Sequence, residues 1–309
     1  MIYKLTEDQI RMVVENGSRY LANYCVGGKI HHVVLGESGG LDSAVTSGFA
    51  QRACQIAKDR NFNLTLVALI MPCDSDPEDT QKGLAVAEKF GAKIIVRRLD
   101  SVFNCCMAEI VGSTNDDTKK ILRETGGEDA LREWDWSGKI AQGNIKARLR
   151  MITLYHHARM MKGMVLSTDN LSEYWMAFWT ICGDVGDFNV IQNIMKGHEL
   201  YDIARYLKVP DNIINSKPGD GLKINGSAED QLGAKYPMID YIMVNLIQQG
   251  FDYNGSFNQL NRLPRLEKSG ESLTEKIARK SLSGAYKRRG TITLSREELG
   301  LLAIEDIQL

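Results

Sequence analysis

The segment that most constrains the fold is Gly36-Glu37-Ser38-Gly39-Gly40-Leu41-Asp42-Ser43, because of what flanks it. It follows the apolar run Val33–Leu35, which predicts a buried strand, and it precedes residues 44–58, which are rich in helix formers. A strand, a Gly-rich turn and a helix in this order surround an anion with free backbone N–H groups and the positive end of a helix dipole. The segment therefore predicts a phosphate-binding loop.

The side chains of this loop agree with that prediction. Gly39 and Gly40 let the backbone approach a phosphate closely and adopt positive φ. Ser38 and Ser43 add hydroxyl donors, and Asp42 is a carboxylate that can hold a Mg²⁺ ion bridging phosphate oxygens. The loop lacks the Gly-Lys-Ser/Thr ending of a Walker A motif and the Gly-x-Gly-x-x-Gly of a dinucleotide fingerprint.

Strands and helices alternate along the chain. Further strands are predicted at Leu64–Met71, 93–96 and Gly163–Ser167. The predicted helices cover residues 6–25, 78–90, 101–133 with a break near 112–117, 139–161, 170–181 and 271–289. This order favours a parallel, doubly wound α/β sheet flanked by helices, with ligands beyond the carboxyl ends of the strands. Ser38 and the segment beginning at Met71 fall at that edge.

Composition narrows the classes of function. The 309 residues allow one large domain or two small ones, and we expect a single domain over 1–309. The net charge of −1 gives no sign of nucleic-acid binding, and no apolar run reaches the roughly 20 residues of a membrane span. The N-terminus lacks the apolar core of a signal peptide. We therefore expect a protein with no nucleic-acid or membrane partner.

The six cysteines form no Cys-x-x-Cys pair, so a zinc or iron–sulfur site is not expected. Cys105 and Cys106 are predicted to be core residues of a helix. Free thiols and the absence of a signal peptide together predict a cytoplasmic protein.

The loop resembles the pyrophosphate loop, Ser-Gly-Gly-x-Asp-Ser, of the ATP pyrophosphatase superfamily. That resemblance implies an adenine nucleotide alpha-hydrolase-like fold and cleavage of ATP between its α and β phosphates. Three further stretches narrow the family: Asn144-Ile-Lys-Ala-Arg148, Thr168-Asp169-Asn170-Leu171-Ser172-Glu173, and Gly183-Asp184-Val185-Gly186-Asp187-Phe188 followed by Lys196. In the second stretch, Asp169 is the expected helix N-cap.

Together these motifs resemble the NAD⁺ synthetase family over about residues 20–290. The resemblance implies a homodimer that adenylates the nicotinic acid carboxylate of deamido-NAD⁺ with Mg-ATP and then lets ammonia displace AMP. It places ATP at residues 36–43, namely Gly36, Glu37, Ser38, Gly39, Gly40, Leu41, Asp42 and Ser43, and also at Met71, Thr168, Lys196 and Gly219.

The same resemblance implies roles for individual residues. Asp42 and Glu173 would bind Mg²⁺, and Asp42, Lys196 and Glu173 would be catalytic. Deamido-NAD⁺ would contact Arg148, Asp187, Tyr286 and Lys287. The Gly/Pro/Ser-rich stretch 216–235 reads either as a linker or as a lid, and its match to the family's mobile Lys-Pro loop favours a lid around residues 216–228.

This sequence departs from the family pattern at several positions. Glu37 stands where an apolar residue is usual, and a carboxylate there repels a triphosphate unless it points away or meets a metal. Tyr286 replaces a His, and Ile181 and Cys182 stand where a Lys is common. The loop begins at residue 36, which leaves no room before it for the glutaminase domain of some members, so the expected nitrogen source is ammonia that is free or comes from a separate partner.

Two other interpretations stay open at this point. One is another adenylating member of the superfamily, such as a tRNA-modifying enzyme, GMP synthetase or an asparagine synthetase domain. The other is a non-catalytic nucleotide sensor, and the departures from the family pattern at Glu37, Ile181 and Tyr286 support that interpretation.

Overall fold

The computed structural model describes residues 4–131, 134–219, 222, 226–263, 272–290, 295–296 and 298–299. Five parallel strands form one sheet in the order β3-β2-β1-β4-β5. The strands are β1 (His32–Gly36), β2 (Thr65–Ile70), β3 (Lys93–Val96), β4 (Met164–Ser167) and β5 (Phe188–Asn189). This is the parallel, doubly wound sheet that the sequence predicts, and the two-residue β5 is an addition to it.

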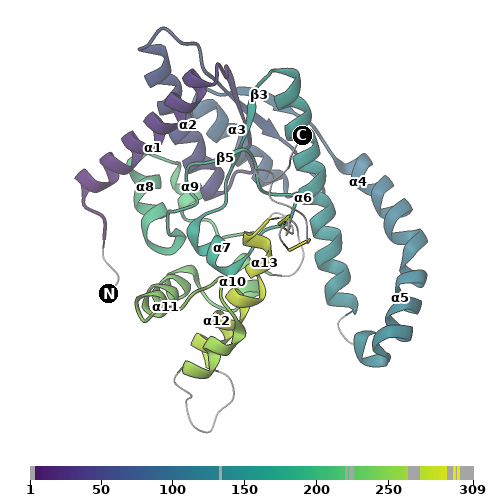
Figure 1. The fold of residues 1–309 in the computed structure, drawn as a ribbon. Coiled ribbons are helices and arrows are strands. Elements are labelled where there is room, and N and C mark those ends of the chain that lie inside the picture. The colour runs from purple at the N-terminus through teal and green to yellow at the C-terminus, as the bar shows by residue number, and fades with distance from the viewer. Residues whose placement is uncertain are drawn as a thin grey trace, which may run out of the picture.

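Helices cover both faces of the sheet (Figure 1). The first half contains α1 (Glu7–Gly27), α2 (Leu41–Lys58), α3 (Pro77–Lys89), α4 (Asp100–Cys106), α5 (Ser113–Gly126) and α6 (Trp134–Met160). The second half contains α7 (Leu171–Met176), α8 (Tyr201–Tyr206), α9 (Asp211–Ile214), α10 (Ala228–Leu232), α11 (Tyr236–Gln248), α12 (Leu273–Ser283) and α13 (Ala285–Arg288). The π-helical segments η1 (Met107–Gly112) and η3 (Lys196–Leu200) and the 3₁₀ segments η2 (Glu128–Leu131) and η4 (Phe257–Arg262) complete the described elements.

Each strand of the sheet centre buries both of its faces. In β1, Val33 and Leu35 pack against α1 and α2, whereas Val34 between them packs against α6. The chain therefore has a continuous apolar run in each central strand, as expected for a parallel sheet covered on both sides. A separate apolar cluster forms where α7, α10, α11 and α12 pack together.

The strand order reverses between β1 and β4. From β1 the chain winds through α2 to β2 and through α3 to β3, and it then returns through α4 to α6 to place β4 on the other side of β1. The loops that leave β1 and β4 diverge at this point, which opens a crevice at the carboxyl edge of the sheet. The fold thus brings residues 36–43 and the residues after Ser167 to the same place.

Several predicted boundaries were wrong. Helix α7 ends at Met176 rather than at residue 181, because Ala177 adopts a left-handed conformation with φ of 49°. The segment 101–133 has no break at 112–117: α4 continues through η1 into α5, which ends at Gly126 before Gly127 with φ of 64°. The predicted helix 271–289 is divided at Gly284 into α12 and α13.

The prediction for Cys105 was also wrong. It is exposed, and Cys106 is half-buried, because α4 and α5 form an arm that stands away from the body of the molecule beside α6 (Figure 1). All six cysteines are unpaired, as expected. Among the described helices, none is long and apolar enough to cross a membrane.

Candidate active site

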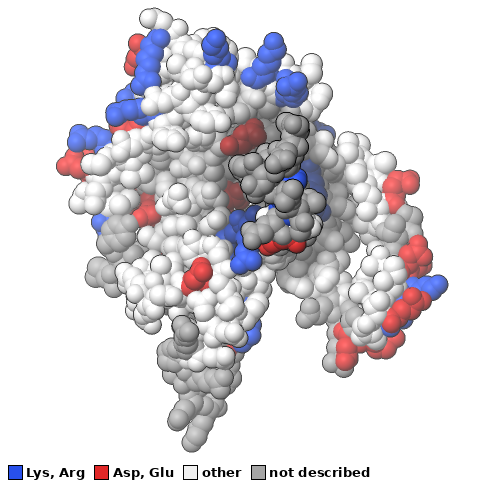
Figure 2. Space-filling model, in the orientation of Figure 1, with Lys and Arg blue, Asp and Glu red and all other residues white. Residues whose placement is uncertain are grey.

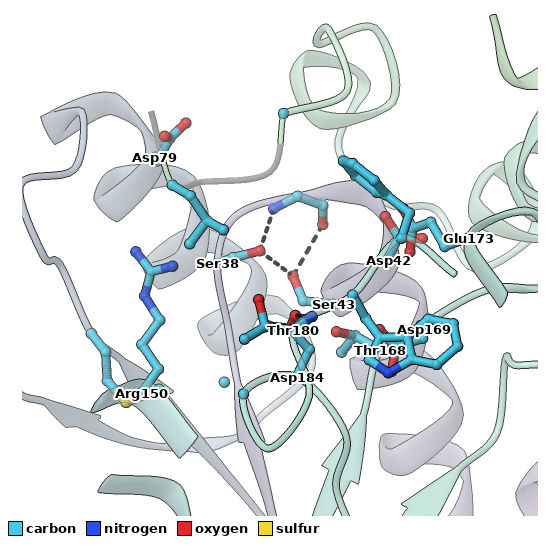
Figure 3. Close-up of a pocket in the computed structure, with 18 of the residues that line it drawn as sticks. Ser38, Asp42, Ser43, Asp79, Arg150, Thr168, Asp169, Glu173, Thr180 and Asp184 are labelled. Atoms are coloured by element: carbon cyan, nitrogen blue, oxygen red, sulfur yellow. Dashed lines mark hydrogen bonds between the residues drawn. The ribbon is translucent and has the colours of Figure 1, made fainter. Parts of the chain in front are cut away.

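A cavity of about 760 Å³ lies at the carboxyl edge of the sheet, where the strand order reverses. Figure 3 shows side chains from the loop after β1, from α3, from α6 and from the segment after β4 arranged around it. Figure 2 shows Lys and Arg side chains gathered around the middle of this face. The predicted residues that line the cavity are Gly36, Glu37, Ser38, Gly39, Gly40, Asp42, Ser43, Met71, Thr168, Glu173, Lys196, Gly219 and Lys287. Leu41 is buried in the core instead.

Hydroxyl groups of the loop itself stabilise the backbone turn that follows β1. The Ser38 Oγ atom lies 3.1 Å from the Ser43 Oγ atom and accepts a hydrogen bond from the Gly40 N–H at 3.2 Å (Figure 3). Gly39 has φ of +79°, and a Cβ atom there would lie 2.5 Å from the Asp79 carbonyl oxygen on α3. Glycine is required at this position both by the backbone conformation and by the close approach of α3.

Replacing Gly39 with Ala should lower the free energy of unfolding by roughly 3 kcal/mol, since positive φ and a backbone clash add together. Gly91 is a matched control, because its φ is +64° but no atom lies within 4 Å of the Cβ that an alanine would add there. G91A should cost only about 1 kcal/mol, the backbone penalty alone. Urea denaturation of both variants measures the difference, and equal losses would contradict the role assigned to the contact with α3.

The Glu37 side chain is buried against the loop and the first turns of α2. It is 2% exposed, and its carboxylate accepts hydrogen bonds from Ser43 Oγ at 2.5 Å, Ser47 Oγ at 2.6 Å and the Gly39 N–H at 3.2 Å. Burial raises the pKa of Glu37 to about 7, although the three donors oppose that shift. The carboxylate therefore acts as an internal brace of the loop.

A buried ion cluster stands beside the loop. The Lys196 Nζ atom lies 2.7 Å from Asp42 Oδ2 and 3.0 Å from Glu173 Oε1. The Tyr236 hydroxyl donates to Glu173 at 2.9 Å, and the Asn170 amide donates to Asp42 at 2.7 Å. Burial lowers the pKa of Lys196, but the two carboxylates outweigh it, so this pKa lies well above its ordinary value. Lys196 is therefore a permanent cation next to the phosphate loop.

The backbone of Lys196 is fixed by a second buried network. The fully buried Asp240 on α11 accepts from Ser172 Oγ at 2.5 Å, from the Gly197 N–H at 2.9 Å and from His198 Nδ1 at 3.1 Å. Ser172 Oγ in turn accepts from the Lys196 N–H at 2.9 Å. This network holds η3 so that the Lys196 side chain points at Asp42.

The N-cap of α7 differs from the prediction. Asn170 caps the helix, with its Oδ1 atom accepting from the Glu173 N–H at 3.0 Å. Asp169 is buried instead, and burial raises its pKa well above the ordinary value. The position of Asn170 thus serves two purposes, since its amide also orients Asp42.

The rest of the cavity wall contains polar residues for which the sequence predicted no role. They include Asp79, Asn144, Arg150, Thr180, Asp184 and Lys280. Thr180 Oγ1 donates to Asn144 at 2.7 Å, and the Thr180 N–H donates to Asp184 at 2.6 Å. Asn144 and Asp184 stand in motifs already singled out from the sequence, which was the signal available for them.

Lys287 and Arg288 on α13 hold α7 and the chain that follows it. The Lys287 Nζ atom donates to the carbonyls of Ala177 at 3.0 Å and Trp179 at 2.7 Å. The Arg288 guanidinium donates to the carbonyls of Tyr174 at 3.2 Å and Trp175 at 3.1 Å. This wall of the cavity therefore depends on α13.

Three of the predicted site residues, all in the described part of the chain, lie outside the cavity. Arg148 is exposed on α6 and donates to the Ile181 carbonyl at 3.2 Å. Asp187 accepts from the Tyr155 hydroxyl at 2.9 Å and from the Val165 N–H at 2.8 Å, and Tyr286 is exposed. Of the predicted lid, Ser216, Lys217, Gly219 and Leu222 line the cavity, whereas 220–221 and 223–225 lie outside the described residues. The lid and these three contacts stay predictions.

Comparison with known proteins identifies the family. A sequence model described as NAD synthase matches residues 13–289. An NH₃-dependent NAD⁺ synthetase of Syntrophomonas wolfei is 33% identical over 67% of this chain and 74% of its own length. One of Archaeoglobus fulgidus is 34% identical over 71% and 76%.

Solved structures share the fold. NMN synthetase from Francisella tularensis superposes with a TM-score of 0.69 at 24% identity, covering 92% of this chain and 98% of its own. NH₃-dependent NAD synthetase from Campylobacter jejuni gives 0.64 at 22% identity, covering 93% and 99%. The ATP pyrophosphatase-type fold expected from the loop is thereby confirmed. From the match over residues 13–289 and the relatives above 30% identity, the chain belongs to the NAD synthase family.

Proposed function

We propose that this protein is an ammonia-dependent NAD⁺ synthetase, a ligase that forms a C–N bond. The carboxylate of the nicotinic acid ring of deamido-NAD⁺ attacks the α-phosphate of ATP and releases pyrophosphate. Ammonia then attacks the acyl-adenylate and releases AMP, which leaves NAD⁺. Relatives that carry this name and share over 30% identity support the proposal.

The observation that carries the proposal is the placement of Lys196 between Asp42 and Glu173 beside the phosphate loop. Adenylation loads negative charge onto the α-phosphate and the leaving pyrophosphate. A cation fixed next to the loop, together with the N–H groups of Gly39 and Gly40, offsets that charge. No side-chain nucleophile is needed, since the substrate carboxylate is itself the nucleophile.

The acids of this cluster also fit Mg²⁺. Among the described residues, no group of three or more His, Cys, Asp or Glu side chains is arranged to hold a metal. Mg²⁺ on a nucleotide needs fewer protein ligands, because phosphate oxygens and waters complete its octahedron. Asp42 and Glu173 would hold the ion, which would supply charge neutralisation to the phosphates when bound.

The remaining predicted contacts complete the proposal. Thr168, Met71 and Gly219 line the cavity and would contact ATP, and Lys287, which also lines it, would contact deamido-NAD⁺. For Arg148, Asp187 and Tyr286, which lie outside the cavity, contacts to deamido-NAD⁺ are proposed from the family resemblance alone. A lid formed by residues 216–228 would keep water from the acyl-adenylate. The free thiols suit a reducing compartment, and we place the protein in the cytoplasm.

We also propose that the protein is a homodimer. Ile152 and Met160 on α6 are 66% and 73% exposed, and Ile110 and Ile121 on the neighbouring arm are 53% and 58% exposed. Large apolar side chains gathered on adjacent helices mark an interaction surface. Sedimentation equilibrium should give a mass near twice the 34.6 kDa of the chain. A monomer at micromolar concentration would contradict this assignment.

The direct test is incubation with deamido-NAD⁺, Mg-ATP and ammonium, followed by chromatography. Equal amounts of NAD⁺, AMP and pyrophosphate are expected. Formation of AMP without NAD⁺ would contradict the assignment of deamido-NAD⁺ as the acceptor. The absence of AMP under every condition would favour a nucleotide sensor. Replacing ammonium by glutamine should abolish NAD⁺ formation.

A further inference from the structure

The carboxylate of Glu37 occupies hydrogen-bond donors that a phosphate-binding loop ordinarily offers to its ligand. It accepts from the Gly39 N–H at 3.2 Å and from Ser43 Oγ at 2.5 Å, and both groups belong to the loop itself. A backbone N–H at a Gly-rich turn and a hydroxyl at the start of a helix are typical phosphate ligands. An ionised Glu37 thus competes with a phosphate for these donors and also adds one negative charge beneath the site.

The loop has a second hydrogen-bond arrangement that suits a neutral Glu37. Ser43 Oγ lies 3.2 Å from the Gly40 carbonyl and 3.1 Å from Ser38 Oγ, so its proton has other acceptors. A protonated Glu37 can then donate to Ser43 Oγ instead of accepting from it. This arrangement weakens the bond from the Gly39 N–H, because a neutral carboxyl is a poorer acceptor than a carboxylate, and it leaves the Ser43 hydroxyl proton able to donate to a phosphate oxygen.

Within the described chain, the groups that contact the Glu37 carboxylate are two hydroxyls and one backbone N–H, all of them neutral. The charged groups on the surrounding elements are engaged elsewhere: Asp42 on α2 pairs with Lys196 on η3, and Lys82 pairs with Glu78 within α3. The other titratable groups there are themselves acidic, namely Asp79 on α3, Asp169 after β4 and Tyr201 on α8. The arrival of a polyphosphate therefore favours the neutral acid.

We propose that Glu37 is a positioning residue that braces the loop as a carboxylate and takes up one proton from solvent when nucleotide phosphates bind there. This inference rests on the proposed function, since it assumes that ATP binds at residues 36–43. It makes the affinity for ATP fall as pH rises, because the carboxylate form must first be protonated.

The direction and size of the effect follow from linkage. With a pKa of about 7, Glu37 is mostly protonated at pH 6 and mostly ionised at pH 8. If binding requires the neutral acid, the apparent Kd scales as one plus the ratio of ionised to neutral Glu37, which gives a rise of about tenfold from pH 6 to pH 8. Below pH 6 the affinity should no longer change through this group.

The experiment is calorimetric titration with the Mg²⁺ complex of α,β-methylene-ATP, which this reaction cannot cleave. We expect the tenfold rise in Kd for the wild type and a change of less than twofold for Glu37→Gln, a neutral side chain of the same shape. Asp79→Asn removes another carboxylic acid of the cavity wall whose pKa is also raised, and it should keep the wild-type slope. Thermal unfolding of each variant checks that it is folded.

A second readout measures proton uptake directly. At pH 8, titrations of the wild type in HEPES and in Tris, whose ionisation enthalpies differ, should report uptake of about one proton per bound nucleotide. Protonation of the analogue itself contributes equally to Glu37→Gln, so the difference between the proteins isolates Glu37. A Kd independent of pH with no proton uptake would overturn this inference alone. Failure of the wild type to bind the analogue even at pH 6 would overturn the proposed function as well.

Discussion

Replacing Lys196 with Ala should lower kcat for NAD⁺ formation by at least about 10³-fold, because the site loses the cation that faces the phosphates. The side chain is 4% exposed and is held by two carboxylates at 2.7 and 3.0 Å. The variant leaves Asp42 and Glu173 facing one another without their counter-ion. The free energy of unfolding should therefore fall by about 3 kcal/mol, the usual result of removing one partner from a buried ion pair.

Steady-state kinetics at saturating ATP and a urea denaturation curve measure these two losses. Lys58→Ala, at the far end of α2, removes a positive charge from the same layer of the fold and should leave both quantities nearly unchanged. If kcat of Lys196→Ala is within tenfold of the wild-type value, the catalytic role assigned to Lys196 is contradicted.

Asp42→Asn has the second-largest expected effect, about 10³-fold in kcat, with the fold retained. The substitution keeps the shape of the side chain but removes the charge that would hold Mg²⁺ and that pairs with Lys196. Its new NH₂ group must also face a donor, either the Asn170 amide or the Lys196 ammonium, which donate to Oδ1 and Oδ2 of Asp42 at 2.7 Å in the wild type. The concentration of Mg²⁺ at half-maximal rate should rise more than tenfold, because one of the two protein carboxylates is gone.

A magnesium titration of the residual activity tests this assignment. Asp59→Asn, at the other end of α2, is the control for loss of one carboxylate and should behave as the wild type. An unchanged half-saturating Mg²⁺ concentration together with normal turnover in Asp42→Asn would contradict a role for Asp42 in metal binding.

The sheet could be predicted from the sequence because its information is local. Runs of apolar residues identify four strands, and the Gly-rich turn after Leu35 fixes the edge at which ligands bind. Strand β5 has only Phe188 and Asn189, which is too short for any periodicity. The end of α7 was missed because Ala177 adopts a left-handed conformation that a non-Gly residue signals weakly in sequence.

The candidate site, like the fold, could be predicted only in part. The motifs predicted roles for Asp42, Glu173 and Lys196, but the contact that the structure shows between them joins residues far apart in the chain and depends on the whole fold. The role of Asp240 could not be predicted, since a carboxylate on an apolar helix has no local pattern that names its partners. The orientation of the Glu37 side chain could not be predicted either, because the sequence left open whether the carboxylate points away from the triphosphate or meets a metal.

The attachment of Lys287 and Arg288 to carbonyls within and just after α7 has a consequence for how the protein is made. Synthesis proceeds from the N-terminus, and each part of the fold can form once its segments have left the ribosome. The sheet and the phosphate loop are available before α13 has emerged, whereas the wall between Tyr174 and Trp179 is fastened by the last of the described helices. The enzyme therefore completes its nucleotide half early in translation and its opposite wall only after residue 288 is free.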